Sequence, residues 1–170
     1  MKTTFSHPER FIAGTVGEPG ERAFFIQVRS SNQLFAVALE KAQVQAIAAR
    51  LEIMISEVRR NDPLLQFSRL ATDDAPLESP IDPQFQVGAI SLTWNDEDKL
   101  ICVEMYEIED ENDDQSQGSI LEVNLDIAQA VAFATRSKAV VNAGRLPCPF
   151  CSIPIDPRGH LCPRANGYRR

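Results

Sequence analysis

Val37-Ala-Leu-Glu-Lys-Ala-Gln-Val-Gln-Ala-Ile-Ala48 joins a strand-like run directly to an amphipathic helical pattern. The pattern returns at an offset of 86 as Val123-Asn-Leu-Asp-Ile-Ala-Gln-Ala-Val-Ala-Phe-Ala134, with identity at six of twelve positions. Beyond each junction the apolar residues recur at helical spacing. In the second copy Asp126 and Gln129 have the spacing of a capping box. These two stretches therefore predict one strand-to-helix junction used twice.

Three strand-like runs precede each predicted helix, rich in β-branched and aromatic residues and bounded by turn formers. The runs are Arg10 to Val16, Ala23 to Arg29, Leu34 to Leu39, Phe85 to Trp94, Leu100 to Ile108 and Ile120 to Leu125. The helices are predicted from about Lys41 to Arg60 and from Asp126 to about Ala143, with Gly144 as a left-handed helix end.

We therefore predict an α+β fold made of two βββα repeats, at about residues 9–60 and 85–144. Such units are expected to form one antiparallel sheet with both helices covering one face. The alternative is a pair of unrelated amphipathic helices, because alanine-rich helices match one another by chance.

The linker between the repeats, residues 61–84, contains four prolines, which block helix and disfavour a central strand. A connection of this length is either a functional loop or a chain wrapped over the surface. The wrapped chain is favoured, because the segment holds apolar residues that a free linker would not need: Leu64, Leu65, Phe67, Leu70, Leu77 and Ile81.

Composition is that of an ordinary globular protein, with 170 residues, 44% hydrophobic and 24% charged. This length suits one compact body, residues 1–144, with an appendage, residues 145–170. The longest apolar run, Leu34 to Leu39, is too short to cross a bilayer, and residues 1–8 lack a signal-peptide core. We therefore expect a cytoplasmic protein without a membrane partner.

The net charge of −7 is unevenly distributed. Residues 145–170 hold five arginines and one aspartate, a net +4, so residues 1–144 carry −11. An acidic body repels phosphate backbones, which leaves nucleic acid as a partner of the tail alone. The simpler interpretation of the arginines is that they keep the tail soluble.

Three of the four cysteines crowd into the tail together with a histidine. The ligand pattern is Cys148-x-x-Cys151 followed by His160-x-Cys162, separated by a loop long enough to bring the two pairs together. Three thiolates and one imidazole form a complete tetrahedral set for Zn²⁺. The tail has too few apolar residues for a core of its own, so bound metal is expected to order it.

Two features depart from a double-knuckle zinc ribbon: Ala165 occupies the place of a fourth cysteine, and Ser152 follows the first knuckle where glycine is common. Three alternatives remain open, namely a redox pair of Cys148 and Cys151, a catalytic zinc with an open position, and an empty site.

Other candidate motifs favour plain interpretations. Cys102 lies in an apolar strand and is expected to be a buried small hydrophobe. His7 is expected to be a surface or packing residue, since no nucleophile stands out beside it. The glycines of 14–20 indicate a hairpin turn. The acidic run 107–114 is expected to be a solvated loop, with a dock for a basic partner as the alternative.

Four stretches of the chain resemble a bacterial family, common in actinobacteria, that is known only as a domain of unknown function. They are Arg10 to Arg22, Val37 to Lys41, Gly144 to Cys151 and Asp156 to Tyr168. The resemblance covers nearly the whole chain and implies that the zinc-ribbon-like tail belongs with this body. It implies no catalytic residues.

Three functions follow as hypotheses. The first is a non-catalytic adaptor for an unidentified protein, in which zinc rigidifies a docking surface. The second is an enzyme or small-ligand-binding protein with a site in the cleft between the repeats. The third is nucleic-acid binding through the tail. In the first hypothesis four tail arginines face the partner: Arg158, Arg164, Arg169 and Arg170.

Overall fold

A computed structural model of the chain describes residues 1–109, 118–144, 146–155 and 159–164. The described elements are, in chain order, β1 (Lys2–Ser6), β2 (Arg10–Val16), β3 (Ala23–Ser30), β4 (Gln33–Leu39), α1 (Lys41–Asn61), β5 (Pro83–Asn95), β6 (Leu100–Glu107), β7 (Ile120–Leu125) and α2 (Ile127–Asn142). The predicted strands and helices are all present, and β1 is an additional strand. The sequence of β1 contains a single large apolar residue, Phe5, which is buried.

The strands form one seven-stranded sheet in the order β1-β7-β6-β5-β4-β3-β2. The pairs β1–β7 and β4–β5 are parallel, and the other neighbours are antiparallel. The prediction of a fully antiparallel sheet was therefore wrong. After β4 the chain passes through α1 and the linker before it reaches β5, and a crossover of that kind is what a parallel neighbour requires.

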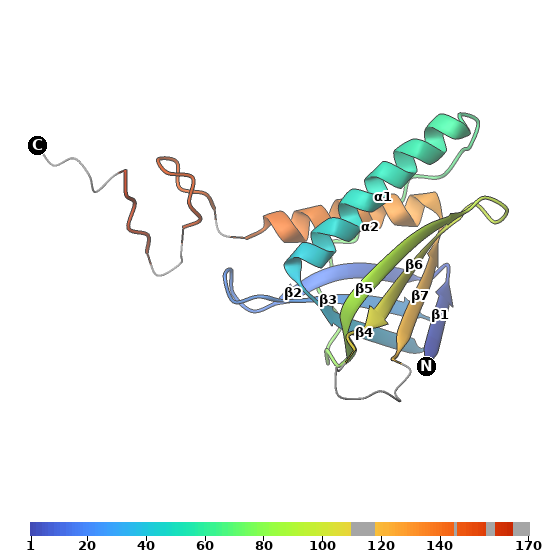
Figure 1. Cartoon of the computed structure of the whole chain (residues 1–170), viewed down its shortest axis with the longest axis horizontal. Helices are drawn as coiled ribbons and strands as arrows, with labels where there is room; N and C mark the ends of the chain where they lie inside the picture. The colour runs from blue at the N-terminus through green and yellow to red at the C-terminus, as the bar shows by residue number, and fades with distance from the viewer. Residues whose placement is uncertain (110–117, 145, 156–158, 165–170) are drawn as a thin grey trace, which may run out of the picture.

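The sheet is strongly curled, because its two outermost strands in the order are consecutive in the chain (Figure 1). From Ser6 to Arg10 an extended chain reaches about 14 Å. A flat sheet of this size would separate its edge strands by about 29 Å, at about 4.8 Å per strand. The short β1–β2 link therefore requires the two edges to approach each other.

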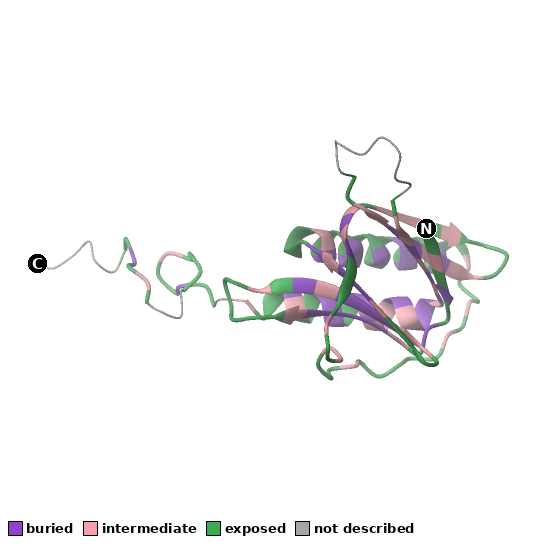
Figure 2. Cartoon of the chain, turned by 90° about the horizontal axis from the view of Figure 1, so that it is seen from below, coloured by how far each residue is buried: buried purple, intermediate pink, exposed green. Residues whose placement is uncertain are grey.

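Both helices lie side by side on the same side of the curled sheet and share one core with it (Figure 1). Figure 2 shows buried residues along the inner side of the strands and helices, with exposed residues outside. The buried stripe of α1 is the predicted one: Val44, Ile47, Ala48, Leu51, Met54, Ile55 and Val58.

A glutamine at the third position of each helix bonds to a backbone carbonyl outside the helix. The amide of Gln43 accepts from Glu40 N at 2.7 Å and donates to Val87 O at 3.1 Å. The amide of Gln129 accepts from Asp126 N at 3.1 Å and donates to Pro8 O at 2.9 Å. The start of α1 is thus fixed to β5 and the start of α2 to the β1–β2 link, each by a glutamine amide.

The linker between the halves runs over β2 and β3, as predicted for a wrapped chain. Asp73 receives a hydrogen bond from Arg10 Nη2 at 3.0 Å, and the backbone of Glu78 exchanges two hydrogen bonds with the Gln27 amide. Leu77 packs against the backbone of Gly14, where a Cβ would lie 2.5 Å from Leu77 Cγ. The linker is therefore held by specific contacts to the body.

The glycine predictions have mixed outcomes. Gly17 and Gly20 have φ of 101° and 100° in the turn between β2 and β3, which agrees with the predicted hairpin. Gly144 does not have a positive φ, so its predicted role as a left-handed helix end was wrong. The helix instead ends at Ala143, with φ −70° and ψ 14°, whose N–H still bonds to Ala139 O.

Two predictions concern regions that the structure describes only in part. The acidic run 107–114 is described as far as Glu109, and its remainder lies outside the described residues. The predicted boundary at residue 145 also falls outside them. Within the described residues, neither helix is long and apolar enough to cross a membrane.

Candidate metal centre

The first half of the tail folds into a tight turn that presents two cysteines. Ser152 N donates to Cys148 O at 2.8 Å, and Cys148 N donates to Ile153 O at 2.9 Å. One step outward, Pro147 and Pro154 form an antiparallel bridge. This small hairpin reverses the chain within a few residues, so that Cys148 and Cys151 face the same point.

Two residues of the tail have the left-handed backbone that such turns require. Ser152 has φ 62°, so the serine adopts the conformation for which glycine is common after a knuckle. Gly159 has φ 117° directly before His160, a value that other residues rarely adopt. The departure at Ser152 noted in the sequence therefore leaves the turn intact.

The four predicted ligands meet in space. Their donor atoms all lie within 4.8 Å of one another. Cys148 Sγ is 3.7 Å from Cys162 Sγ, and Cys151 Sγ is 3.1 Å from His160 Nε2. Tetrahedral zinc with Zn–S bonds of about 2.3 Å would place two sulfurs about 3.8 Å apart. The spacing of the sulfurs is therefore suited to one tetrahedral ion.

The environment favours a thiolate at Cys148, whereas desolvation raises the pKa of Cys151. Cys148 and Cys162 are buried, and Cys151 and His160 are half-buried. Backbone N–H groups of Cys151 and Phe150 hydrogen-bond to the Cys148 sulfur and lower the pKa of this thiol to about 6. A thiolate is the form that binds a divalent metal. Three cysteine sulfurs and one histidine nitrogen complete a tetrahedral shell, which is the arrangement of structural zinc sites.

Of the four arginines predicted to face a partner, the structure describes one. Arg164 is exposed, and its Nη1 donates to Phe150 O at 3.2 Å, which ties the end of the tail to the knuckle. The other three, Arg158, Arg169 and Arg170, lie outside the described residues.

The tail also exposes large apolar side chains, a feature that sequence reasoning missed. The exposed fractions are 75% for Leu146, 64% for Phe150 and 85% for Leu161. Ile153 and Ile155 are exposed as well. The signal was available in the sequence, because the metal ligands take up the small interior and leave no core for these side chains to enter.

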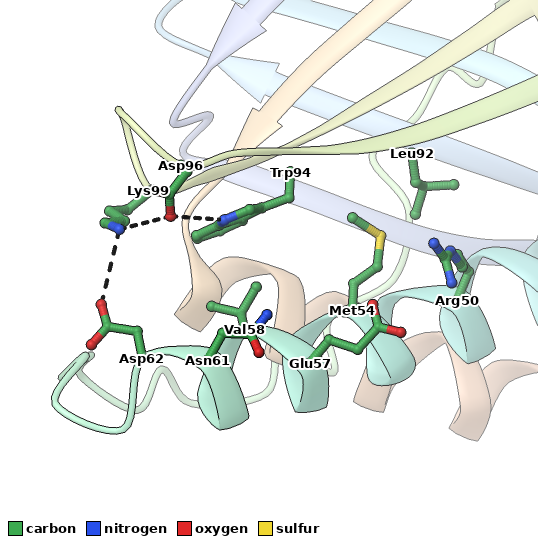
Figure 3. A pocket seen from close by; sticks show the side chains of 10 residues that line it. All are labelled: Arg50, Met54, Glu57, Val58, Asn61, Asp62, Leu92, Trp94, Asp96 and Lys99. Carbon is green, nitrogen blue, oxygen red and sulfur yellow. Dashed lines mark hydrogen bonds and ion pairs between the residues drawn. The ribbon is translucent and has the colours of Figure 1, made fainter.

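A cavity of about 650 Å³ lies between α1 and the β5–β6 hairpin (Figure 3). Met54, Val58, Leu92 and Trp94 supply apolar surface, and Arg50, Glu57, Asn61, Asp62, Asp96 and Lys99 supply polar groups. Lys99 and Asp96 hydrogen-bond at 2.8 Å, which raises the pKa of Lys99 and lowers that of Asp96. An ordinary ion pair explains both shifts.

A second group of potential ligands lies on the outer side of β6 and β7. Cys102, Glu104 and Glu122 have donor atoms within 4.8 Å of one another. Lys2 already forms an ion pair with each carboxylate, at 3.0 Å from Glu104 and in contact with Glu122. Cys102 is half-buried here and does not enter the core, because β6 alternates and its neighbours Ile101 and Val103 point inward. The prediction of a buried Cys102 was wrong.

The fold and the cluster together define an α+β protein with a curled mixed sheet, two helices and a C-terminal Cys3His group able to hold a metal ion. A family model described as a protein of unknown function, DUF3090, matches residues 3–162. The chain therefore belongs to this family, and the match includes all four cluster residues. No curated protein and no solved structure matches the chain.

Proposed function

We propose that the chain is a non-catalytic adaptor of the cytoplasm whose tail is ordered by one structural Zn²⁺ bound to Cys148, Cys151, His160 and Cys162. The observation that carries the proposal is the convergence of four donor atoms within 4.8 Å on a segment with little other interior. Structural zinc contributes about 10–16 kcal/mol of apparent binding free energy in small fingers, enough to order a tail of this size.

The chemistry of the tail surface supports a docking role. Phe150, between Cys148 and Cys151 in the chain, and Leu161, between His160 and Cys162, are largely exposed. Arg164 bonds to Phe150 O. Aromatic and arginine side chains are enriched in the buried centres of protein interfaces. A closed four-ligand shell has no open position for a substrate, so catalysis by the metal is not part of the proposal.

The docking role is tested by quantitative co-purification from the native cytoplasm, followed by reconstitution with the purified partner. We expect one protein to bind the wild type and the Ile53→Ser variant, which alters an exposed apolar residue of α1. The same protein should be lost from Phe150→Ser/Leu161→Ser and after chelation of the metal. A partner set that is the same for all of these forms would contradict the adaptor role.

The same co-purified samples distinguish a protein partner from nucleic acid bound through the tail. Nuclease treatment would remove a partner held through nucleic acid, and the affinity would fall steeply with salt. A protein–protein contact centred on Phe150 and Leu161 should be insensitive to nuclease.

A second candidate function is small-ligand binding between the halves. The observation that favours it is the cavity between α1 and β5–β6, whose wall holds the only tryptophan of the chain, Trp94 (Figure 3). A ligand there should shift the Trp94 emission, and Arg50→Ala or Glu57→Ala should remove that shift. A compound library that leaves the emission unchanged would count against this function.

We propose, in addition, that the body is an internal duplication of a βββα unit. Gln43 and Gln129 occupy matching positions at the offset of 86, and each donates to a backbone carbonyl outside its helix, Val87 O in β5 and Pro8 O in the β1–β2 link. The parallel pair β4–β5 joins the last strand of the first unit to the first strand of the second, whereas β7 pairs with β1, which precedes the first unit.

A further inference from the structure

A second cavity, of about 420 Å³, lies where the β2–β3 turn, the start of α1 and the end of α2 meet. Its polar groups come from Arg22, Lys41 and Asn142, and its apolar surface comes from Phe24, Val141 and Pro154. The described residues that line it include no aspartate or glutamate. This is unusual for a body that carries −11 over 144 residues.

Arg22 is held in place by two contacts. Its Nη1 donates to Val140 O at 3.0 Å, at the end of α2. Its guanidinium carbon lies 5.1 Å from the centroid of the Phe24 ring, in a cation–π arrangement. These contacts leave Nη2 directed at Gly144, 3.3 Å from the position that a Cβ would occupy there.

Lys41 approaches the same point from the first turn of α1. Its Nζ lies 3.7 Å from the Cβ position of Gly144, so the two cationic groups are within 7.0 Å of each other. Among the described residues neither cation has an ion-pair partner, and like charges this close repel. The positive end of the α1 dipole adds to the same potential. Gly144 keeps the space between them free of a side chain.

We propose that this cavity binds the phosphate group of a small phosphorylated molecule. A phosphomonoester carries about −1.5 to −2 charges at neutral pH, which matches the two cations better than a singly charged carboxylate does. Its oxygens can accept from Arg22 Nη2, from Lys41 Nζ and from the Asn142 amide. The cavity is larger than a phosphate, and the apolar wall of Phe24, Val141 and Pro154 faces the remainder of the molecule.

The test is calorimetric titration of the full, metal-loaded chain at low ionic strength, with phenyl phosphate and inorganic phosphate as probes. We expect one saturable site per chain and tighter binding of phenyl phosphate, whose ring can contact the apolar wall. Arg22→Gln and Lys41→Gln should each weaken binding by about tenfold or more, the effect of losing one charge-assisted contact. Arg59→Gln, which removes the same charge from the last turn of α1 at a distant site, should bind as the wild type does.

Gly144→Ala provides a variant without a change of charge. Its Cβ would lie 3.3 Å from Arg22 Nη2 and occupy the space between the cations, so phosphate should bind more weakly while thermal unfolding stays near that of the wild type. Three results would overturn the proposal: no saturable binding of either probe, equal affinity in the wild type and both glutamine variants, or benzoate binding as tightly as phenyl phosphate.

Discussion

At the scale of single residues, Asp73 is one of the attachments of the linker to the body. Its carboxylate bonds to Arg10, and its backbone carbonyl accepts from the buried Arg136, whose Nε also donates to Ala13 O at 2.7 Å. The hydrogen bond from Arg10 holds the pKa of Asp73 below its usual range. A carboxyl with a depressed pKa stabilises the fold above its unfolded pKa, and this contribution is lost as the pH falls through the lower, folded value.

Asp73→Asn is therefore expected to lower the free energy of unfolding at neutral pH. Solvent reaches 35% of the Asp73 side chain, so the loss should be about 1 kcal/mol, less than for a fully buried pair. The difference from the wild type should shrink as the pH falls below about 4, the unfolded pKa, and through the lower folded pKa, below which Asp73 is protonated in both states. Urea unfolding at acidic and neutral pH measures this difference in the free energy of unfolding. A difference that grows in acid would contradict the depressed pKa of Asp73.

The Ser137 hydroxyl is expected to destabilise the fold, whereas the Asp73 carboxylate stabilises it. It is fully buried in α2, and among the described side chains its hydroxyl is the only buried polar group without a hydrogen-bond partner. Ser137→Ala should raise the free energy of unfolding by about 1 kcal/mol, because an unsatisfied buried hydroxyl is costly. Thr135→Ala is the control on the same helix, since that residue is exposed. A lower denaturation midpoint for Ser137→Ala would show that the hydroxyl has a partner, such as a buried water.

At the scale of elements, the attachment of the linker to β2 depends on a residue without a side chain. Gly14→Ala would place a Cβ 2.5 Å from Leu77 Cγ, and because Gly14 does not have a positive φ the cost comes from the clash. We expect the free energy of unfolding to fall by about 1–3 kcal/mol and cleavage of the linker by protease to accelerate.

A double-mutant cycle isolates that contact. In a Leu77→Ala background the clash is relieved, so Gly14→Ala should cost much less than it does alone. Equal costs in both backgrounds would mean that Leu77 does not occupy the position that the structure assigns to it.

Elements that depend on local sequence were predicted well from sequence. The stripe of α1 and the Asp126–Gln129 capping box follow from spacing within one helix, and both are present. The spacing of the tail cysteines and histidine likewise predicted the four residues whose donor atoms lie close together in the structure. Features set by long-range pairing were missed, because nothing local in Lys2–Ser6 or in Arg136 indicates a parallel partner strand or a buried guanidinium.

At the scale of the whole molecule, the chain combines two modes of stabilisation. The body has one continuous apolar core shared by the sheet and both helices. The tail leaves its large apolar side chains exposed and brings its cysteines and histidine inward instead. Under the proposed function, the core stabilises the body and the metal orders the tail surface that binds the partner. The body does not need that surface for folding.

The metal content of the natively purified protein tests this account most directly. We predict one zinc ion per chain by inductively coupled plasma mass spectrometry. The zinc should be retained in Cys102→Ser and lost in Cys148→Ser/Cys162→Ser. A wild-type chain with no more bound metal than the Cys148→Ser/Cys162→Ser variant would contradict the account.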